Sequence, residues 1–298
     1  MWKRVSLLVL LAAIVVTVPV ILTERALGIA PERRTQPDGA KAQEIAGSSG
    51  TAWSDAEIAA ADGAKLKGWA FLPLPEHDAG KAVILLHGAG DSRRGMLGFA
   101  RFFAQRGYTT LVVDSRGHGV SAGSEVTYGL LEKEDMHRWA SYLLSLRPKS
   151  KLYGLGMSMG AAILIQALDT EPRFRSIVAE CSYATFREAA GERIPRITGL
   201  PAILSRPIVD TAFLYARLRY GIDLDAAAPL ETLKRTRTPV LLIHGLADRN
   251  TAPEQSRELH AANPTVTDLW EVPDAKHVQA SVVAPREFEE RVLRWFDK

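Results

Sequence analysis

The sequence predicts an α/β protein with a mostly parallel central sheet covered by helices on both faces. From about residue 65 onward, short apolar runs alternate with helical stretches. Strands buried on both faces are typically continuous apolar runs, and their alternation with helices is typical of a parallel sheet. The chain has 298 residues, of which 47% are hydrophobic and 24% charged. This ordinary globular composition excludes a disordered, collagen-like or disulfide-scaffold chain.

The charge distribution and the cysteine count exclude further classes. Lys and Arg number 37 against 34 Asp and Glu, and the net charge of +3 is scattered without a basic run. We therefore expect no nucleic-acid partner. The single cysteine, Cys181, cannot form an internal disulfide, and its position after an apolar run predicts a small core residue.

The N-terminus predicts a membrane segment. Residues Val5 to Leu22 carry no charge and follow Lys3 and Arg4. A helix of this length spans about 27 Å, close to the hydrocarbon thickness of a bilayer. A cleaved secretory signal is the alternative, but its apolar region is usually only about 7–15 residues long. We expect residues 1–29 to form an uncleaved signal anchor with one transmembrane helix, and a secreted protein if the segment is cleaved.

The residues around this segment predict how the chain is oriented. Lys3 and Arg4 favour a cytoplasmic N-terminus, so the bulk of the chain is expected outside the cytoplasm, in the periplasm or the extracellular space. Residues 30–51 are rich in Gly, Ser, Pro and charge, which is typical of a flexible tether. Residues 52–298 then form the folded domain.

The elements of this domain follow from turns and apolar periodicity. Trp53–Ala60 and Lys65–Leu72 flank Ala61-Asp62-Gly63-Ala64, a pattern that predicts a hairpin. The later strands are predicted at Ala82–Leu86, Thr109–Asp114, Leu152–Gly156, Ser176–Ala179, Val240–Ile243 and Thr267–Val272. The helices between them are predicted at Met96–Gln105, Leu130–Leu146 and Ala161–Leu168. A last helix has Phe288, Val292, Trp295 and Phe296 on one face.

One connection is much longer than the others. Roughly sixty residues separate Cys181 from Pro239, whereas an ordinary connection has about 2–6. We expect a helical cap inserted at about residues 184–235, above the sheet. A larger packing helix with long loops is the alternative interpretation.

The strongest motif is Gly156-Met157-Ser158-Met159-Gly160, which lies between a predicted strand and a predicted helix. G-x-S-x-G in this context is the nucleophile elbow, a turn so sharp that its serine is strained. Side chains at Gly156 and Gly160 would collide with the neighbouring strand and helix. The turn would therefore expose the Ser158 hydroxyl above the carboxyl edge of the sheet.

A serine hydroxyl is a weak nucleophile and needs a base that is oriented by an acid. Asp248 and His277 each follow a predicted strand, so both are expected at the sheet edge where Ser158 lies. Their chain order, serine, acid, histidine, is the order that accompanies this elbow. Asp223, Asp225 and Asp274 are the alternative acids. The first two fall in the cap region, and the third is too close to His277 in sequence unless its carboxylate folds back.

An oxyanion stabiliser is expected at the end of the strand Ala82–Leu86, where the sequence is His87-Gly88-Ala89-Gly90. The backbone N–H groups of Ala89 and Met159 are the predicted donors to a developing negative charge. His87 and Gly88 are expected to support this loop.

Together these blocks resemble the α/β-hydrolase family, and most closely its membrane-anchored, short-cap branch of ABHD-type and serine aminopeptidase-like lipases. The resemblance rests on the four blocks around His87, Gly156–Gly160, Asp248 and His277, and on Asp114-Ser115-Arg116-Gly117-His118-Gly119-Val120-Ser121. It runs from about Leu66 to the C-terminus. It implies the α/β-hydrolase fold and a Ser-His-Asp triad. The cap matches no family pattern, so the substrate is not implied.

Competing interpretations of single motifs are weaker. Gly154, Gly156 and Gly160, followed by Glu180, imitate a dinucleotide-binding fingerprint, but that motif normally occupies the first βα unit. Asp114 and His118 form a second acid–histidine pair, which in the resembled family is mainly structural. No H-E-x-x-H motif or Cys/His cluster occurs, so neither a metal nor another cofactor is expected.

The sequence therefore predicts a serine hydrolase that cleaves a carboxylic ester of a lipid or other hydrophobic acid. Its predicted partners are that small-molecule or lipid ester and, through the N-terminal helix, a membrane. Peptidase, thioesterase or acyltransferase chemistry on the same triad is an alternative. A non-catalytic, membrane-tethered binding scaffold is the alternative from another class.

Overall fold

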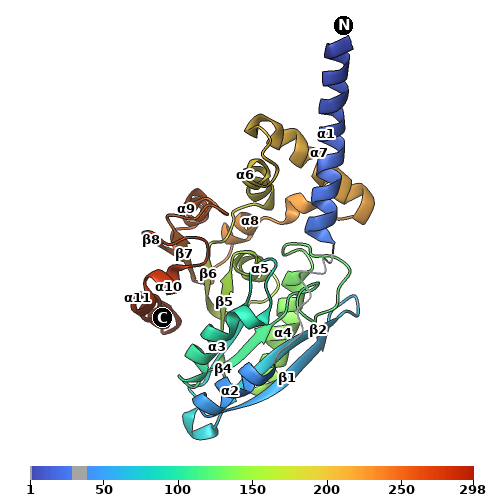
Figure 1. Ribbon diagram of the computed structural model, residues 1–298. Helices are drawn as coiled ribbons and strands as arrows, with labels where there is room; N and C mark the ends of the chain where they lie inside the picture. The colour runs from blue at the N-terminus through green and yellow to red at the C-terminus, as the bar shows by residue number, and fades with distance from the viewer. Residues whose placement is uncertain (1, 29–38) are drawn as a thin grey trace.

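The protein, a computed structural model, is described over residues 2–28 and 39–298, with side chains from Val15 onward. Eight strands form one sheet in the order β1-β2-β4-β3-β5-β6-β7-β8 (Figure 1). The strands are β1 Thr51–Ala59, β2 Lys65–Pro73, β3 Lys81–Leu86, β4 Thr109–Val113, β5 Lys151–Met157, β6 Phe174–Glu180, β7 Val240–Gly245 and β8 Thr267–Val272. β2 is antiparallel to β1 and β4, and every other pairing is parallel. The predicted α/β class and mostly parallel sheet are confirmed.

Helices cover both faces of the sheet and bury its alternating side chains. On β3, Ile84 belongs to one core cluster, whereas Val83 and Leu85 belong to the other. Successive strand residues point to opposite faces, so the continuous apolar run is needed to fill both. The helices that contribute to the first cluster include α4 Glu132–Leu146 and α5 Met159–Ala167. Those of the second are α2 Gly39–Ser49, α3 Leu97–Ala104 and α11 Pro285–Phe296.

The N-terminal helix α1, Trp2–Leu27, differs from its predicted role. In the part of the chain that the structure describes, no helix is both long enough and apolar enough to cross a membrane. The predicted transmembrane helix over Val5–Leu22 is thus not found, and the side chains of residues 5–14 lie outside the description. The end of α1 packs on the domain, where Leu27 is fully buried and the Thr23 hydroxyl donates to the Ala212 carbonyl at 3.3 Å.

The predicted tether at residues 30–51 is wrong in its second half. Residues 39–49 form α2, which packs against α3 and β1. Ala42, Ile45 and Ala46 are buried there, at the spacing of one helix face. Gly and Ser in this stretch obscured a short amphipathic pattern that tertiary packing stabilises. Residues 29–38 of the predicted tether lie outside the described residues.

The long connection between β6 and β7 is helical, as the cap prediction expected. It holds α6 Phe186–Thr198, η4 Ala202–Leu204, α7 Ser205–Tyr220, η5 Leu224–Ala226 and α8 Pro229–Leu233. Figure 1 shows α6 and α7 beyond the carboxyl edge of the sheet, with α7 beside α1. Arg187 on α6 forms ion pairs with Asp210 on α7 and with Asp225 on η5. These pairs join the three cap elements.

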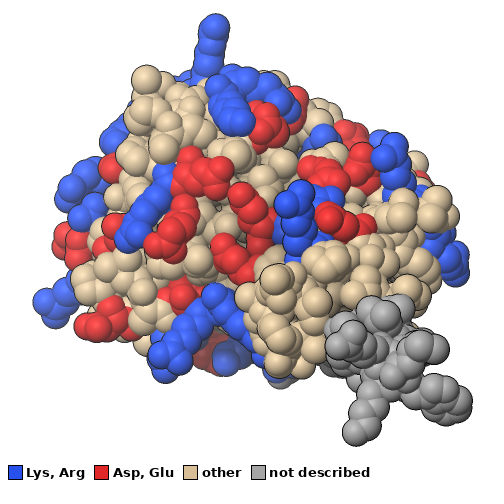
Figure 2. Space-filling model, turned by 90° about the horizontal axis from the view of Figure 1, so that it is seen from above, with Lys and Arg blue, Asp and Glu red and all other residues tan. Residues whose placement is uncertain are grey.

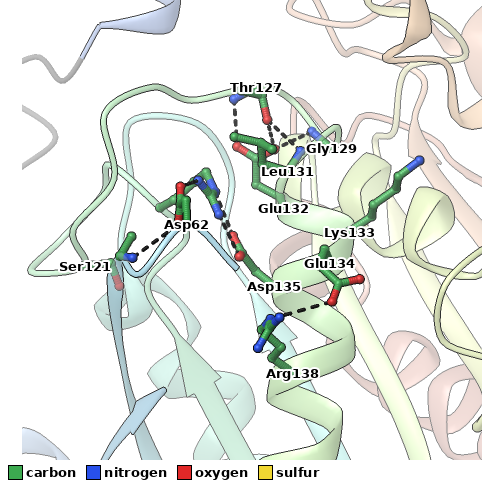
Figure 3. A network of polar contacts seen from close by, with 12 residues as sticks. Asp62, Ser121, Thr127, Gly129, Leu131, Glu132, Lys133, Glu134, Asp135 and Arg138 are labelled. Atoms are coloured by element: carbon green, nitrogen blue, oxygen red, sulfur yellow. Dashed lines mark hydrogen bonds and ion pairs between the residues drawn. The ribbon is translucent and has the colours of Figure 1, made fainter. Parts of the chain in front are cut away.

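A buried polar network holds the loop that follows β4 (Figure 3). Arg116 donates to both carboxylate oxygens of Asp135 at 2.7 Å and to Asp62 at 2.8 Å. Burial opposes the charged form of Arg116, but the two carboxylates raise its pKa above the usual range. Glu132 accepts hydrogen bonds from the N–H groups of Thr127 and Gly129. The hairpin turn, the loop and the start of α4 are thereby locked together.

Candidate active site

Ser158 occupies a strained turn between β5 and α5. Its backbone angles are φ 53° and ψ −117°, in a region that non-glycine residues rarely adopt. Such a conformation costs about 1–3 kcal/mol and persists only where the surroundings hold it. Here the Ser158 N–H donates to the Glu180 carbonyl at 2.7 Å. The turn therefore has the geometry that the G-x-S-x-G motif predicts.

The two motif glycines are required by close packing. A Cβ atom on Gly160 would lie 2.3 Å from the Leu86 carbonyl oxygen, and one on Gly156 would lie 2.5 Å from the Gly160 carbonyl oxygen. Backbone atoms cannot move aside as a flexible side chain can. Any side chain at either position would push α5 away from β3 and β5.

Three predicted residues form one hydrogen-bonded chain. His277 Nε2 lies 2.9 Å from Ser158 Oγ, and His277 Nδ1 lies 2.7 Å from Asp248 Oδ2. Asp248 lies in the loop after β7, and His277 lies in the loop after β8. Both loops are at the edge of the sheet where β5 ends and Ser158 follows it. The imidazole thus faces the serine with one nitrogen and the carboxylate with the other.

The electrostatic surroundings keep Asp248 ionised. Burial of the carboxyl group raises its pKa, but hydrogen bonds from His244 and His277 outweigh burial and hold the pKa well below the usual range. Its other oxygen accepts from the N–H groups of Asn250 and Thr251 at 2.7 and 3.1 Å. A fixed carboxylate of this kind orients an imidazole and stabilises its protonated form.

The alternative acids lie elsewhere. Asp225 pairs with Arg187 in the cap, and the Asp223 side chain accepts from the Asp225 N–H. Asp274 is exposed to solvent. The structure therefore brings Asp248, and none of these three, to His277.

The loop at the end of β3 lies next to the serine. A Cβ on Gly88 would lie 3.3 Å from Ser158 Cβ. The His87 ring accepts from the Ser115 N–H at 3.1 Å, so its other nitrogen donates to the Gly88 carbonyl at 2.7 Å. Met159 is the first residue of α5, so its N–H has no acceptor within the helix. This is the setting in which the sequence predicts an oxyanion hole.

Asp114, His118 and Gly154, for which the sequence allowed other interpretations, make contacts with neighbouring residues that explain them structurally. Asp114 accepts from the N–H groups of Arg93 and Val120 at 2.7 and 3.1 Å, and His118 Nδ1 lies 3.0 Å from the Arg116 carbonyl. These contacts shape the loop after β4. A Cβ on Gly154 would lie 3.2 Å from three apolar side chains, so this glycine is explained by packing.

Glu180 is a site residue whose place sequence reasoning missed. It ends β6 and is fully buried; one carboxyl oxygen accepts from the Ala280 N–H at 2.9 Å. The other oxygen has no partner among the described residues. Burial, assisted by the charge of Asp248, raises the pKa of Glu180 to about 7 against the lowering effects of Ala280 and His244. The signal in the sequence that could have identified Glu180 is an acidic residue at the end of an otherwise apolar strand.

Glu180 also links two parts of the site. Its backbone carbonyl holds the Ser158 N–H, and its side chain holds Ala280, three residues after His277. Val278, between them, has φ 51°, which is a strained conformation for a β-branched residue. The loop bearing His277 is thus held by contacts that the motif does not contain.

Cys181, His244 and Asp248 form a buried cluster with donor atoms within 4.8 Å of one another. The donor set suits a metal poorly. Burial raises the pKa of the Cys181 thiol well above its usual range. Asp248 is already engaged by His277, and His244 Nδ1 lies 2.6 Å from the Ser256 hydroxyl.

The chain is similar in sequence and in fold to known proteins. Residues 83–291 match the Alpha/beta hydrolase family. The uncharacterised protein YqkD of Bacillus subtilis is 26% identical over 243 residues, which cover 80% of this chain and 78% of YqkD. The esterase Pf2001 of Pyrococcus furiosus is 26% identical with a TM-score of 0.70, over 89% of this chain and 97% of its own. An acylaminoacyl peptidase of Pyrococcus horikoshii shares the fold, with a TM-score of 0.63 at 18% identity over 83% of this chain and 42% of the peptidase.

Proposed function

The chain belongs to the alpha/beta hydrolase family, and on this premise we propose that it is a serine hydrolase that cleaves carboxylic esters. The observation that carries the proposal is the unbroken chain from Ser158 Oγ through His277 to Asp248, with distances of 2.9 and 2.7 Å. The esterase among the structural neighbours supports hydrolysis of an ester.

In the proposed first half-reaction, Ser158 Oγ attacks the ester carbonyl carbon while His277 Nε2 accepts the hydroxyl proton. The resulting oxyanion is stabilised by the N–H groups of Ala89 and Met159. Loss of one such donor typically lowers kcat about 10²–10³-fold. The carbon–oxygen bond to the alcohol then breaks, His277 returns its proton to the leaving alkoxide, and an acyl-enzyme remains.

In the second half-reaction, water replaces the alcohol. His277 Nε2 accepts a proton from the water as its oxygen attacks the acyl carbon, and the carboxylic acid leaves as the proton returns to Ser158 Oγ. Asp248 stays ionised throughout, holds the Nδ1–H tautomer and stabilises the imidazolium in both half-reactions.

We propose that the acyl group is hydrophobic. Apolar side chains of the cap face outward, with Ile203 84% and Leu218 77% exposed. The cap that carries them lies beyond the sheet edge where Ser158 is found, and exposed apolar side chains can contact an apolar acyl group. Membership of the membrane-anchored branch, with the catalytic domain outside the cytoplasm, stays a prediction from the N-terminal sequence. Fractionation of cells that express the full chain, with a protease-accessibility assay on the intact membrane, tests it.

The proposal is tested by labelling with a fluorophosphonate probe, which reacts with activated serines. Wild-type protein is expected to label, and Ser158→Ala and His277→Ala are expected to abolish labelling. Ser141→Ala, an exposed serine on α4, is the matched control that should label like wild type. Failure of a folded protein to label would favour the binding scaffold, and labelling of Ser158→Ala would contradict the nucleophile.

A substrate series then separates the remaining alternatives. p-Nitrophenyl esters of increasing acyl length, a matched thioester and a peptide anilide are compared by kcat/KM. A preference for longer acyl esters supports the proposal. A preference for the thioester or the anilide would replace it with the thioesterase or peptidase alternative, and an acyl product formed with an added alcohol would indicate transfer.

A further inference from the structure

A hollow lies at the opposite edge of the sheet from Ser158. Its volume is about 450 Å³, and its lining includes residues from the beginnings of β3, β5 and β6 and just before β7. Strand β5 connects the two places directly, because it starts at Lys151 in the hollow and ends beside Ser158. At about 3.3 Å per residue, the two positions are roughly 23 Å apart. An ester bound at Ser158 therefore does not fill this hollow.

The charge of the hollow is strongly unbalanced. Its lining has four cationic residues besides the terminal Lys298, namely Lys81, Lys151, Arg175 and Arg237, and one acidic residue, Asp297. Asp297 forms an ion pair with Lys81. Among the described residues, no ion pair is found for Lys151, Arg175 or Arg237.

The aromatic residues that line the hollow are buried, since Tyr153 is 4% exposed, Phe174 3% and Phe296 1%. The rings of Tyr153 and Phe296 stack with their centroids 4.6 Å apart, and Phe174, Pro172 and Pro239 complete the lining beside them. Burial raises the pKa of the Tyr153 hydroxyl, although Lys81 and Arg175 lie close enough to lower it. This hydroxyl therefore stays protonated at neutral pH.

We propose that this hollow binds a small organic phosphate through its phosphate group. Arginine side chains form paired hydrogen bonds with phosphate oxygens, and Arg175 and Arg237 supply two guanidinium groups without an internal acid. The volume lies within the range of about 300–1,000 Å³ that is usual for small-molecule sites. The site is distinct from the ester-cleaving site and does not depend on the proposed function.

The test is isothermal titration calorimetry of the full chain at low ionic strength. Adenosine monophosphate is the probe, adenosine is its uncharged counterpart, and inorganic phosphate lacks the ring. The double variant Arg175→Gln/Arg237→Gln is expected to weaken binding of the monophosphate at least about tenfold, as lost charge-assisted hydrogen bonds would. Arg286→Gln, which removes one exposed arginine at the far end of α11, should bind like wild type.

Each outcome is decisive. Binding of adenosine monophosphate that is weakened only in the double variant supports the site. Absence of heat with wild-type protein at millimolar probe, or equal affinity in the double variant, overturns it. Equal affinity for inorganic phosphate and the monophosphate overturns a contribution from the organic group. Fluorophosphonate labelling or the far-ultraviolet circular dichroism spectrum shows that the double variant is folded, whichever of the two proposals fails.

Discussion

The carboxyl edge of the sheet and the cap above it are built differently. At the sheet edge, short hydrogen bonds join buried or half-buried groups that come from β5, β6, β7 and β8. In the cap, the ion pairs of Arg187 are exposed, and apolar side chains face outward. Figure 2, seen from above, shows acidic and basic groups side by side on this end of the molecule.

This difference indicates that amino-acid substitutions are tolerated better in the cap than at the carboxyl edge of the sheet. A buried polar group that loses its partner is left unsatisfied and costs about 1–3 kcal/mol, whereas an exposed ion pair is worth only about 0–1 kcal/mol. The sheet edge is thus expected to keep its residues, while the cap is free to vary with the substrate. Four changes test this contrast.

The largest effect is expected at the acid. Asp248→Asn removes the negative charge that stabilises the His277 imidazolium, and it favours the wrong tautomer. We expect kcat/KM for a p-nitrophenyl ester to fall about 10⁴-fold with little change in circular dichroism. Asp225→Asn in the cap is the matched control and should change kcat/KM less than about threefold. Equal losses in the two variants would contradict the assignment of Asp248.

The next effect is a pH dependence of stability. The pKa of Glu180 is about 7 in the folded protein and 4.5 as an ordinary glutamate, so the native state binds the proton more tightly. The stabilisation from this proton is full below pH 4.5 and is lost as the pH rises towards 7. Across that range, the free energy of unfolding should fall by about 3 kcal/mol relative to Glu180→Gln.

Urea unfolding of both proteins between pH 4.5 and 8 measures this difference. Parallel pH profiles would show that Glu180 has an ordinary pKa. The contribution of Asp248 to the pH dependence of unfolding has the opposite sign, because its pKa is lowered on folding and its stabilisation is lost only as the pH falls. This contribution is the same in both proteins. It therefore cancels in the comparison.

Two glycines provide a matched pair across the two regions. Gly160→Ala forces a Cβ against the Leu86 carbonyl and should destabilise the protein by about 2–3 kcal/mol. Gly191, within cap helix α6, has nothing within 4 Å of an added Cβ, so Gly191→Ala should stabilise by about 0.5–1 kcal/mol. Thermal and urea unfolding give both values. A change of the same sign in both variants would break the contrast.

The smallest effect is expected for the cap ion pair. A double-mutant cycle on Arg187→Ala and Asp210→Ala should give a coupling energy of about 0.2–1 kcal/mol, which high salt weakens. Urea unfolding at low and high ionic strength measures it. A coupling above about 2 kcal/mol would place the cap among the rigid parts of the molecule.

Much of the fold could be predicted because its signals are local. Each central strand is a continuous apolar run such as Val83–Leu86, and the elbow is five consecutive residues. The loop positions of Asp248 and His277 follow from the rule that parallel strands end at one edge. Helix α2 was missed because Gln and Glu interrupt its three buried residues, Gly, Lys and Ser flank them, and only contact with α3 and β1 stabilises the helix.

The sequence by itself determined the α/β class, the strained serine turn and the order of serine, acid and histidine, because each depends on residues adjacent in the chain. Tertiary structure decided the docking of α1 on the cap, the link from Glu180 to the His277 loop, and the gathering of Lys151, Arg175 and Arg237 around one hollow. These features join residues far apart in sequence. Such contacts form when packed strands and helices bring their ends together, and no local pattern encodes them.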